Sequence, residues 1–173
     1  ICGNFGIPAC SINDPGENGV IILELSSYQL DGAKSLSLDI ATIINITPDH
    51  LDYHETFDRY VSSKLKIINF LKRNGIFIYD KSNKLLNKII DANKYNSLKF
   101  SSVNEKEAKD FINDNNYLKG THNAINASIA ISIAKKLNIK DNKIELAIKR
   151  FEGLSHRMEP LYISKNFRII NDS

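Results

Sequence analysis

Two short apolar runs constrain the fold of this chain more than any other feature of its sequence. Residues 20–25 (Val-Ile-Ile-Leu-Glu-Leu) and 41–46 (Ala-Thr-Ile-Ile-Asn-Ile) are rich in β-branched side chains. Neither run alternates polar and apolar residues as a strand with one wet face does. Runs of this kind are typical of a parallel sheet whose two faces are both covered. We therefore expect both runs to be buried strands of such a sheet.

Helix-like and strand-like segments alternate along the rest of the chain. Residues 56–72 have the apolar spacing of an amphipathic helix, Asn74-Gly75 is a typical helix stop, and 76–79 is expected to be a strand. This alternation predicts an α/β fold with a largely parallel sheet flanked by helices. The further expected elements are helices over 26–37, 81–92, 120–137 and 141–151 (with Asp141 as N-cap), a strand over 97–101, an irregular stretch over 105–116 and a β-hairpin over 161–170.

Composition narrows the class of protein. The 173 residues are 42% hydrophobic and 25% charged, which is the balance of a globular domain. The net charge of +3 is small and dispersed, so we expect no nucleic acid partner. The two cysteines, Cys2 and Cys10, form no disulfide framework, and no apolar run is long enough to cross a membrane. We expect a cytoplasmic monomer that does not bind membranes.

Polar residues interrupt or follow the two apolar runs. Glu24 stands near the carboxyl end of the first run, and residues 47–54 (Thr-Pro-Asp-His-Leu-Asp-Tyr-His) follow the second. Ligands of open α/β sheets bind outside the carboxyl ends of the strands. Asp and His side chains there could hold a divalent cation, and Mg²⁺ is the cation that oxygen ligands favour. The alternative is a solvated strand end, followed by a polar loop in which Asp49 caps a helix.

Lys64 lies within the apolar stripe of the helix over 56–72. It is three or four positions from Tyr60, Val61, Ile67 and Ile68, whereas Lys66 falls on the expected wet face. A lysine in such a place usually extends its amine to water. The functional interpretation is an amine made reactive by burial, which favours its neutral form.

Asn123 and Asn126 stand one turn apart at the start of the helix over 120–137, where a nucleotide or an anion could bind. Ordinary helix capping explains these residues equally well. Arg157 and Asp172 are weak signals when taken singly. No phosphate loop of the GxxxxGK[ST] type occurs in the sequence.

Taken in order, six segments resemble the Mur ligase family, the ATP-dependent amide ligases of peptidoglycan assembly. The resemblance spans essentially the whole chain, and the combination is far more specific than any one segment. The segments are 3–8 (Gly-Asn-Phe-Gly-Ile-Pro), 23–30 (Leu-Glu-Leu-Ser-Ser-Tyr-Gln-Leu), 45–52 (Asn-Ile-Thr-Pro-Asp-His-Leu-Asp), 120–126 (Gly-Thr-His-Asn-Ala-Ile-Asn), 155–159 (Ser-His-Arg-Met-Glu) and 171–173 (Asn-Asp-Ser).

The resemblance implies roles for the matching residues. Glu24 and His50 would hold Mg²⁺, and Lys64 would be carbamylated by CO₂, so that the new carboxylate positions the metal. These three residues are the implied catalytic set. The residues implied to contact the UDP-N-acetylmuramoyl-L-alanine substrate are Asn4, Ser26, Gln29 and His50. Those implied to contact ATP are Asn123, Asn126, Arg157 and Asp172.

Within the family, residues 23–30 are most similar to the member that adds D-glutamate to UDP-N-acetylmuramoyl-L-alanine through an acyl phosphate. That resemblance implies a part in cell wall synthesis, cell shape and cell division. The chain starts at Ile1 and stops directly after a strand-like segment, so we expect an incomplete central ATP-binding domain. The phosphate loop, a UDP-binding domain and an amino-acid-binding domain would then lie outside it, and the fragment alone is expected to be inactive.

Three other functions stay open at this point. A sister Mur ligase or a folylpolyglutamate synthetase would share the Mg²⁺ and ATP residues, although residues 26–29 (Ser-Ser-Tyr-Gln) argue against both. A metal-dependent phosphohydrolase could use Asp49, His50 and Asp52, but it needs more metal ligands than a chain with four histidines readily offers. A catalytically silent binding module is the third.

Overall fold

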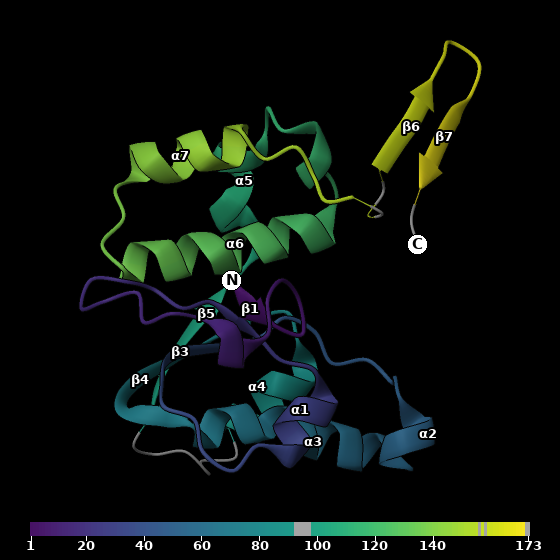
Figure 1. Ribbon diagram of the computed structural model, residues 1–173. Coiled ribbons are helices and arrows are strands. Elements are labelled where there is room, and N and C mark those ends of the chain that lie inside the picture. The colour runs from purple at the N-terminus through teal and green to yellow at the C-terminus, as the bar shows by residue number, and fades with distance from the viewer. Residues whose placement is uncertain (92–97, 156, 158, 172–173) are drawn as a thin grey trace. The chain divides into compact units, whose positions relative to one another are not determined.

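The computed structural model describes residues 1–91, 98–155, 157 and 159–171 (Figure 1). The chain forms two compact units, Ile1–Phe77 with Asn93–Phe100 and Ile78–Ala92 with Ser101–Ser173. The expected α/β class is confirmed, because strands of a parallel sheet alternate with helices along the chain.

The strands of the described residues form three sheets. β3 (Leu38–Ile43), β4 (Leu71–Asp80) and β5 (Lys99–Val103) form one sheet in that order. β1 (Cys2–Gly3) and β2 (Leu23–Glu24) form a short parallel pair. The predicted C-terminal hairpin is confirmed as the antiparallel pair β6 (Glu159–Ile163) and β7 (Arg168–Asn171).

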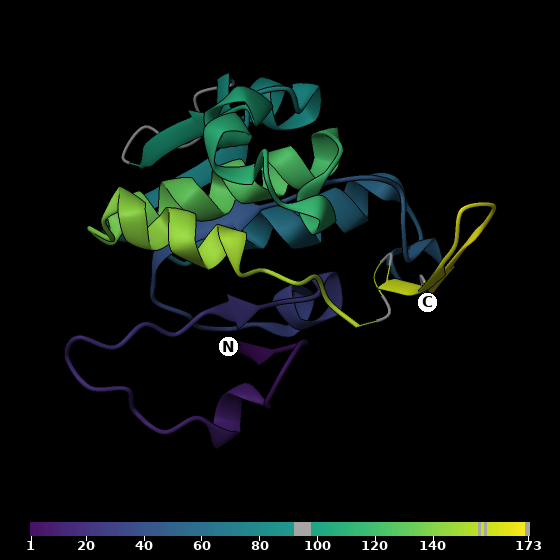
Figure 2. The ribbon, with the colours of Figure 1, turned by 90° about the horizontal axis from the view of Figure 1, so that it is seen from above.

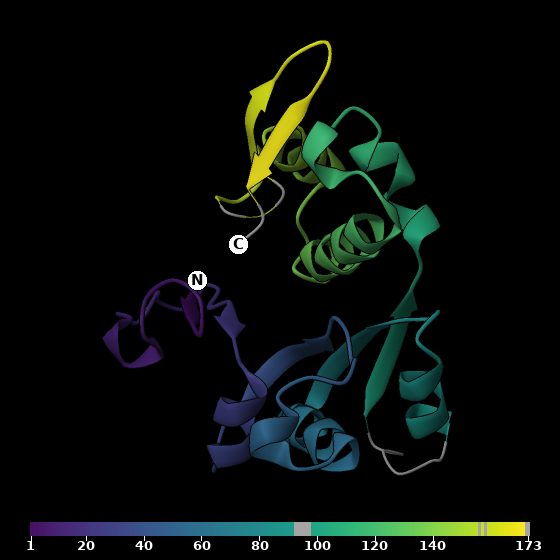
Figure 3. The ribbon, with the colours of Figure 1, turned by 90° about the vertical axis from the view of Figure 1, so that its right-hand side faces the viewer.

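Three helices of the first unit carry or directly follow several of the residues singled out in the sequence. α1 (Ser27–Gly32) packs against α3 (Phe57–Asn69), and the short α2 (Leu51–His54) comes just before α3 in the chain (Figure 3). α3 begins after Thr56, whose Oγ1 accepts a hydrogen bond of 3.2 Å from the backbone N–H of Arg59. It buries Tyr60, Val61 and Ile68, so the predicted apolar stripe is confirmed.

The second unit is mainly helical. α6 (Thr121–Lys136) and α7 (Asp141–Lys149) lie side by side (Figure 2), and α5 (Lys109–Ile112) packs with them. Their shared core consists of Ala108, Ala127, Ile131 and Ile144. The remaining helical elements of this unit are α4 (Lys84–Asp91) and the 3-10 helices η2 (Glu105–Ala108) and η3 (Asn116–Leu118), while a further 3-10 helix, η1 (Ala9–Ser11), belongs to the first unit.

The two apolar runs form strands over different residues than predicted. β2 covers only Leu23–Glu24, and Val20, Ile21 and Ile22 are exposed, so the prediction of a buried strand over 20–25 is wrong for its first half. The physical reason is that β2 pairs with β1 over two residues, which leaves the preceding apolar residues uncovered in the described structure. β3 begins and ends three residues before the predicted run over 41–46.

The predicted helix stop at Gly75 is wrong. α3 ends at Asn69, and Gly75 is a buried residue within β4. The backbone N–H of Leu38 donates to the Phe70 carbonyl at 2.9 Å, which pairs the chain with β3 just before β4 begins. Pairing between strands therefore overrides the local turn preference of Asn74-Gly75.

Three other predictions need correction or lie outside the description. Residues 105–116 contain η2 and α5 rather than an irregular loop, because Asn104 and Glu107 form a capping box that begins a helical turn. Lys140 is the N-cap of α7, and Asp141 is its first helical residue. Residues 92–97, where one predicted helix ends and one predicted strand begins, lie outside the described residues.

Among the residues that are described, no helix is both long and apolar enough to span a bilayer.

We expect Gly75→Ala to lower the free energy of unfolding by about 1–3 kcal/mol, because the added methyl group overpacks a buried site. A Cβ at this position would lie 2.9 Å from Leu71 Cδ2, 3.0 Å from the Lys72 carbonyl oxygen and 3.1 Å from the Leu38 carbonyl oxygen. Chemical denaturation of the purified protein measures the change.

Gly32→Ala is the matched control. Gly32 is an exposed helical residue, and a Cβ there meets no atom within 4 Å. We expect that substitution to stabilise the protein by about 0.5–1 kcal/mol, since alanine loses less backbone entropy on folding. Equal effects at the two glycines would contradict the assignment of Gly75 to a tightly packed strand.

Candidate functional site

Three of the four residues expected to bind the UDP-linked substrate lie in two hydrogen-bonded pairs of the first unit, Ser26 with Gln29 and Asn4 with the expected metal residue Glu24. Gln29 Oε1 accepts from the Ser26 backbone N–H at 2.9 Å and from Ser26 Oγ at 3.1 Å, and the Gln29 backbone N–H donates to Ser26 Oγ at 3.3 Å. This capping box begins α1. Asn4 Nδ2 lies 3.5 Å from Glu24 Oε1, and the Asn4 N–H donates to the Glu24 carbonyl at 2.8 Å.

His50 lies just before α2 in the left-handed backbone region, with φ of 52°. This conformation is uncommon for residues other than glycine, although histidine adopts it more readily than most. The Asp49 carboxylate accepts a 2.8 Å hydrogen bond from the His50 backbone N–H and lies 3.6 Å from His50 Nδ1. The exposed imidazole is 5.0 Å from the Tyr28 ring, centroid to centroid. The backbone geometry therefore turns this side chain out of the helix that follows it.

Lys64 is half-buried on α3. Its amine donates to the Asn45 carbonyl at 3.2 Å and lies 5.2 Å from the centroid of the Tyr60 ring. The His50 ring lies 6.5 Å from the same Tyr60 ring, centroid to centroid. His50 and Lys64 are thus brought to one aromatic ring. Among the described residues, no hydrogen bond or ion pair joins Glu24 to either of them.

These contacts bear on whether the first unit could hold a metal. The residues offer one exposed carboxylate at Glu24, one exposed imidazole at His50 and one amine at Lys64. Within the described part of the chain, no cluster of three or more His, Cys, Asp or Glu side chains could hold a metal ion. One carboxylate and one imidazole are few ligands, so an ion held here would have to take most of its ligands from water or from a substrate phosphate, as Mg²⁺ commonly does.

Lys66, which the sequence places on the wet face of α3, has a side chain that is 39% exposed but also contacts α1. Its amine forms an ion pair with Asp31 Oδ1 at 2.6 Å and donates to the Asp31 carbonyl at 2.8 Å. Ser63 Oγ donates to the same carboxylate at 3.1 Å. The hydrogen bonds from Lys66 and Ser63 hold the pKa of the Asp31 carboxyl below its usual value. The α1–α3 contact therefore carries a polar cluster that the helical periodicity of α3 alone does not reveal.

Aromatic side chains around His50 are a feature that the sequence analysis missed. Tyr28 stacks at an angle against Tyr53, with ring centroids 4.5 Å apart, and the buried His54 lies 5.4 Å from Tyr60. Partial burial, followed by the negative charges of Asp52 and Asp49, raises the pKa of the Tyr28 phenol. The repeated aromatic residues between positions 53 and 60 are the sequence signal that could have pointed to this cluster.

In the second unit, Asn123 is held at the start of α6. Its Nδ2 donates to the Lys119 carbonyl at 3.0 Å and to the Tyr117 carbonyl at 3.4 Å. Asn126 and Arg157 are exposed, and Asp172 lies outside the described residues. Among the described residues, no side-chain hydrogen bond or ion pair joins Asn123, Asn126 and Arg157 to one another.

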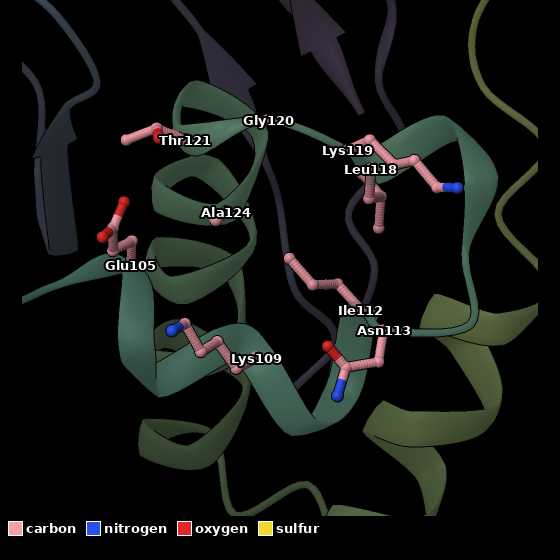
Figure 4. Close-up of a pocket in the computed structure, with 9 residues that line it drawn as sticks. All are labelled: Glu105, Lys109, Ile112, Asn113, Leu118, Lys119, Gly120, Thr121 and Ala124. Atoms are coloured by element: carbon pink, nitrogen blue, oxygen red, sulfur yellow. The ribbon is translucent and has the colours of Figure 1, made fainter.

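A pocket of about 340 Å³ opens beside the N-terminus of α6 (Figure 4). Two amines, those of Lys109 and Lys119, and one carboxylate, that of Glu105, belong to its lining. Neither Asn123 nor Asn126 is among the residues that line the pocket, which are Glu105, Lys109, Ile112, Asn113, Leu118, Lys119, Gly120, Thr121 and Ala124.

Comparison with known proteins identifies the family. The model of the Mur ligase middle domain matches residues 5–140. The chain belongs to the Mur ligase family. Relatives named UDP-N-acetylmuramoylalanine–D-glutamate ligase include those of Sphingopyxis alaskensis (36% identical over 99% of this chain), Caldicellulosiruptor bescii (30% over 100%) and Bacillus cereus (32% over 100%). The chain spans 39–42% of the length of these relatives.

A solved Mur ligase has the same fold. The crystal structure of MurF from Acinetobacter baumannii matches 88% of this chain and 38% of its own, with a TM-score of 0.66 at 17% sequence identity. At that identity the match supports the architecture, which agrees with the α/β class predicted from the alternating strands and helices.

We expect Asp31→Asn to lower stability more at pH 7 than at pH 3. The folded protein lowers the pKa of this carboxyl, so its stabilising contribution is fully present above the ordinary pKa of about 3.9 and is lost as the pH falls through the lower folded-state value. Denaturant unfolding of both proteins at the two pH values measures the difference.

Asp39→Asn is the control for this experiment. Asp39 forms an exposed ion pair with Lys72 at 2.8 Å, so its loss should change the free energy of unfolding by about 1 kcal/mol or less. A deficit in Asp31→Asn that is the same at both pH values would show that the Lys66 and Ser63 hydrogen bonds do not act through ionisation of Asp31.

Proposed function

We propose that this chain is the central, ATP-binding part of a ligase that joins D-glutamate to UDP-N-acetylmuramoyl-L-alanine in peptidoglycan precursor synthesis. One observation carries the proposal: relatives with that enzyme name align over 99–100% of the chain at 30–36% identity. A cytoplasmic monomer that supports cell shape and division is the matching biological setting.

The proposed reaction is acyl activation. The γ-phosphate of ATP is transferred to the substrate carboxylate, the amine of D-glutamate attacks the acyl phosphate, and the tetrahedral intermediate expels phosphate. Asn4, Ser26 and Gln29 would orient the UDP-linked substrate through hydrogen bonds. Their amide and hydroxyl groups suit neutral sugar and peptide atoms. The Ser26–Gln29 hydrogen bond and the contact of Asn4 with Glu24 would hold them in place before the substrate arrives. Those proposed to bind ATP are Asn123, Asn126, Arg157 and Asp172.

Glu24, His50 and Lys64 would hold Mg²⁺. When bound, the ion would neutralise charge on the transferring phosphoryl group. An ammonium at Lys64 would repel it, whereas a carbamate would attract it. Carbamylation forms a bond between Nζ and the carbon of CO₂, and the amine gives up a proton. Lys64 is half-buried on α3 and shares the Tyr60 ring with His50, which supports its proposed place beside the other metal residue.

An assay of the full-length protein tests the proposed function. Release of phosphate from ATP should require both UDP-N-acetylmuramoyl-L-alanine and D-glutamate, and the product should contain one new amide bond. L-Glutamate, L-lysine and meso-diaminopimelate serve as alternative acceptors. Turnover with one of these in place of D-glutamate would assign the chain to a sister ligase, and turnover with a folate acceptor would assign it to a folylpolyglutamate synthetase.

We expect Lys64→Ala and Lys64→Arg in the full-length protein to lose turnover by about 10²-fold or more, because neither side chain can acquire a carboxylate. Acetate or formate should restore part of the activity of Lys64→Ala by occupying the vacated volume. Steady-state phosphate release, with and without the added acid, measures both effects.

Arg59→Ala is the control on the same helix. Arg59 is exposed and forms an ion pair with Glu55, so its removal should leave turnover near that of the native protein. Lys66 is unsuitable as a neutral control here, because a substitution would also remove its ion pair with Asp31. Near-normal turnover of Lys64→Arg would rule out the carbamate.

A further inference from the structure

A buried hydrogen bond joins two residues to which the proposed mechanism gives no part. His54 Nε2 lies 2.9 Å from Ser27 Oγ, and the two side chains are only 4% and 3% exposed. The two positions are 27 apart in the sequence. The His54 ring is surrounded by Tyr28, Tyr53 and Tyr60 at centroid distances of 5.6, 4.8 and 5.4 Å.

Burying an imidazole and a hydroxyl is costly unless they satisfy one another. An apolar side chain at position 54 could fill the same aromatic surroundings without that cost. A buried polar pair differs from an apolar contact because its distance and direction are fixed. The pair therefore supplies a defined alignment between the two segments it joins.

The two segments are those that carry the proposed substrate and metal residues. Ser27 is the first residue of α1, directly after Ser26 and two positions before Gln29. His54 is the last residue of α2, one turn after His50.

Few interactions within α2 itself fix its position. It contains four residues, and its two flanking residues, His50 and Glu55, have positive φ angles of 52° and 63°. So short a helix is not stable alone. Its position must come from contacts such as the one between His54 and Ser27.

We propose that His54 and Ser27 are a positioning pair that holds the first turn of α1 in register with His50, so that the Ser26–Gln29 face and the metal-side imidazole meet the same substrate molecule. This inference rests on the proposed function, since it assigns a role toward the UDP-linked substrate. His54 touches neither substrate nor metal in this role and acts through Ser27 and the backbone of α2.

The test uses the full-length protein with His54→Phe, His54→Gln, Ser27→Ala and the double variant His54→Phe/Ser27→Ala. Phenylalanine keeps the ring volume but cannot form the hydrogen bond, whereas the glutamine amide can replace Nε2. His54→Phe and Ser27→Ala should each raise KM for UDP-N-acetylmuramoyl-L-alanine by about tenfold, the effect of one lost buried hydrogen bond. KM for ATP should stay the same.

Two further results are expected if the pair acts as a unit. The double variant should be no worse than the poorer single variant, because both substitutions remove the same interaction. His54→Gln should recover most of the lost substrate affinity. Calorimetric titration with UDP-N-acetylmuramoyl-L-alanine provides the same comparison without turnover.

Lys66→Met separates positioning from general loosening of the helix pair. It removes the ion pair with Asp31 at the other end of α1, so it should lower the melting temperature while leaving KM for the UDP-linked substrate unchanged. Unchanged KM in His54→Phe, additive single variants, or an equal rise in KM for Lys66→Met would each overturn the inference. A native protein that binds the UDP-linked substrate but does not use D-glutamate would instead refute the proposed function and leave the positioning role standing.

Discussion

The buried ring of Tyr60 is the contact on which the candidate site of the first unit depends. It is 3% exposed. Its neighbours are His50, which precedes α2, His54, which ends α2, and Lys64, which lies on α3. A rigid aromatic ring gives these polar side chains one common surface to pack against. The position of α3, which carries Tyr60, therefore determines where the imidazole of His50 and the amine of Lys64 lie. α3 in turn packs against α1.

Sequence patterns predicted the fold well where local chemistry decides the structure. The helices over 56–72, 120–137 and 141–151 and the C-terminal hairpin all form near their expected bounds, because apolar periodicity and capping residues act within a few positions. The sequence patterns gave the wrong structure where pairing between strands that are distant in sequence competes with the local conformational preference. Gly75 lies inside β4 although Asn74-Gly75 favours a turn, and Val20–Ile22 stay exposed although their composition favours a buried strand. Neither outcome can be derived without knowing which strand pairs with which.

The candidate site shows the same contrast between features set by local sequence and features set by distant residues. The placement of Lys64 inside an apolar stripe and of Ser26 at a helix start could be deduced from spacing, and both agree with the structure. The partners of Lys66 and His54 could not be deduced from spacing. Lys66 meets Asp31, 35 positions away along the chain, and His54 meets Ser27, 27 positions away. Helical periodicity assigns a residue to a face but does not say which residue of another helix it meets. For that reason the polar contacts between α1, α2 and α3 emerge only from the three-dimensional arrangement.

The surroundings of Lys64 also constrain the proposed carbamate. As an ammonium, the side chain gains a hydrogen bond to the Asn45 carbonyl and an attraction to the face of Tyr60. A carbamate loses the attraction to Tyr60, because the face of an aromatic ring repels negative charge, and its carboxylate oxygens cannot donate to the Asn45 carbonyl, although its one remaining N–H still can. Carbamylated Lys64 must therefore turn its new carboxylate away from Asn45 and Tyr60. Such a group is stable only where a cation or a hydrogen-bond donor receives it, so the modification and the binding of Mg²⁺ with its phosphates would stabilise one another.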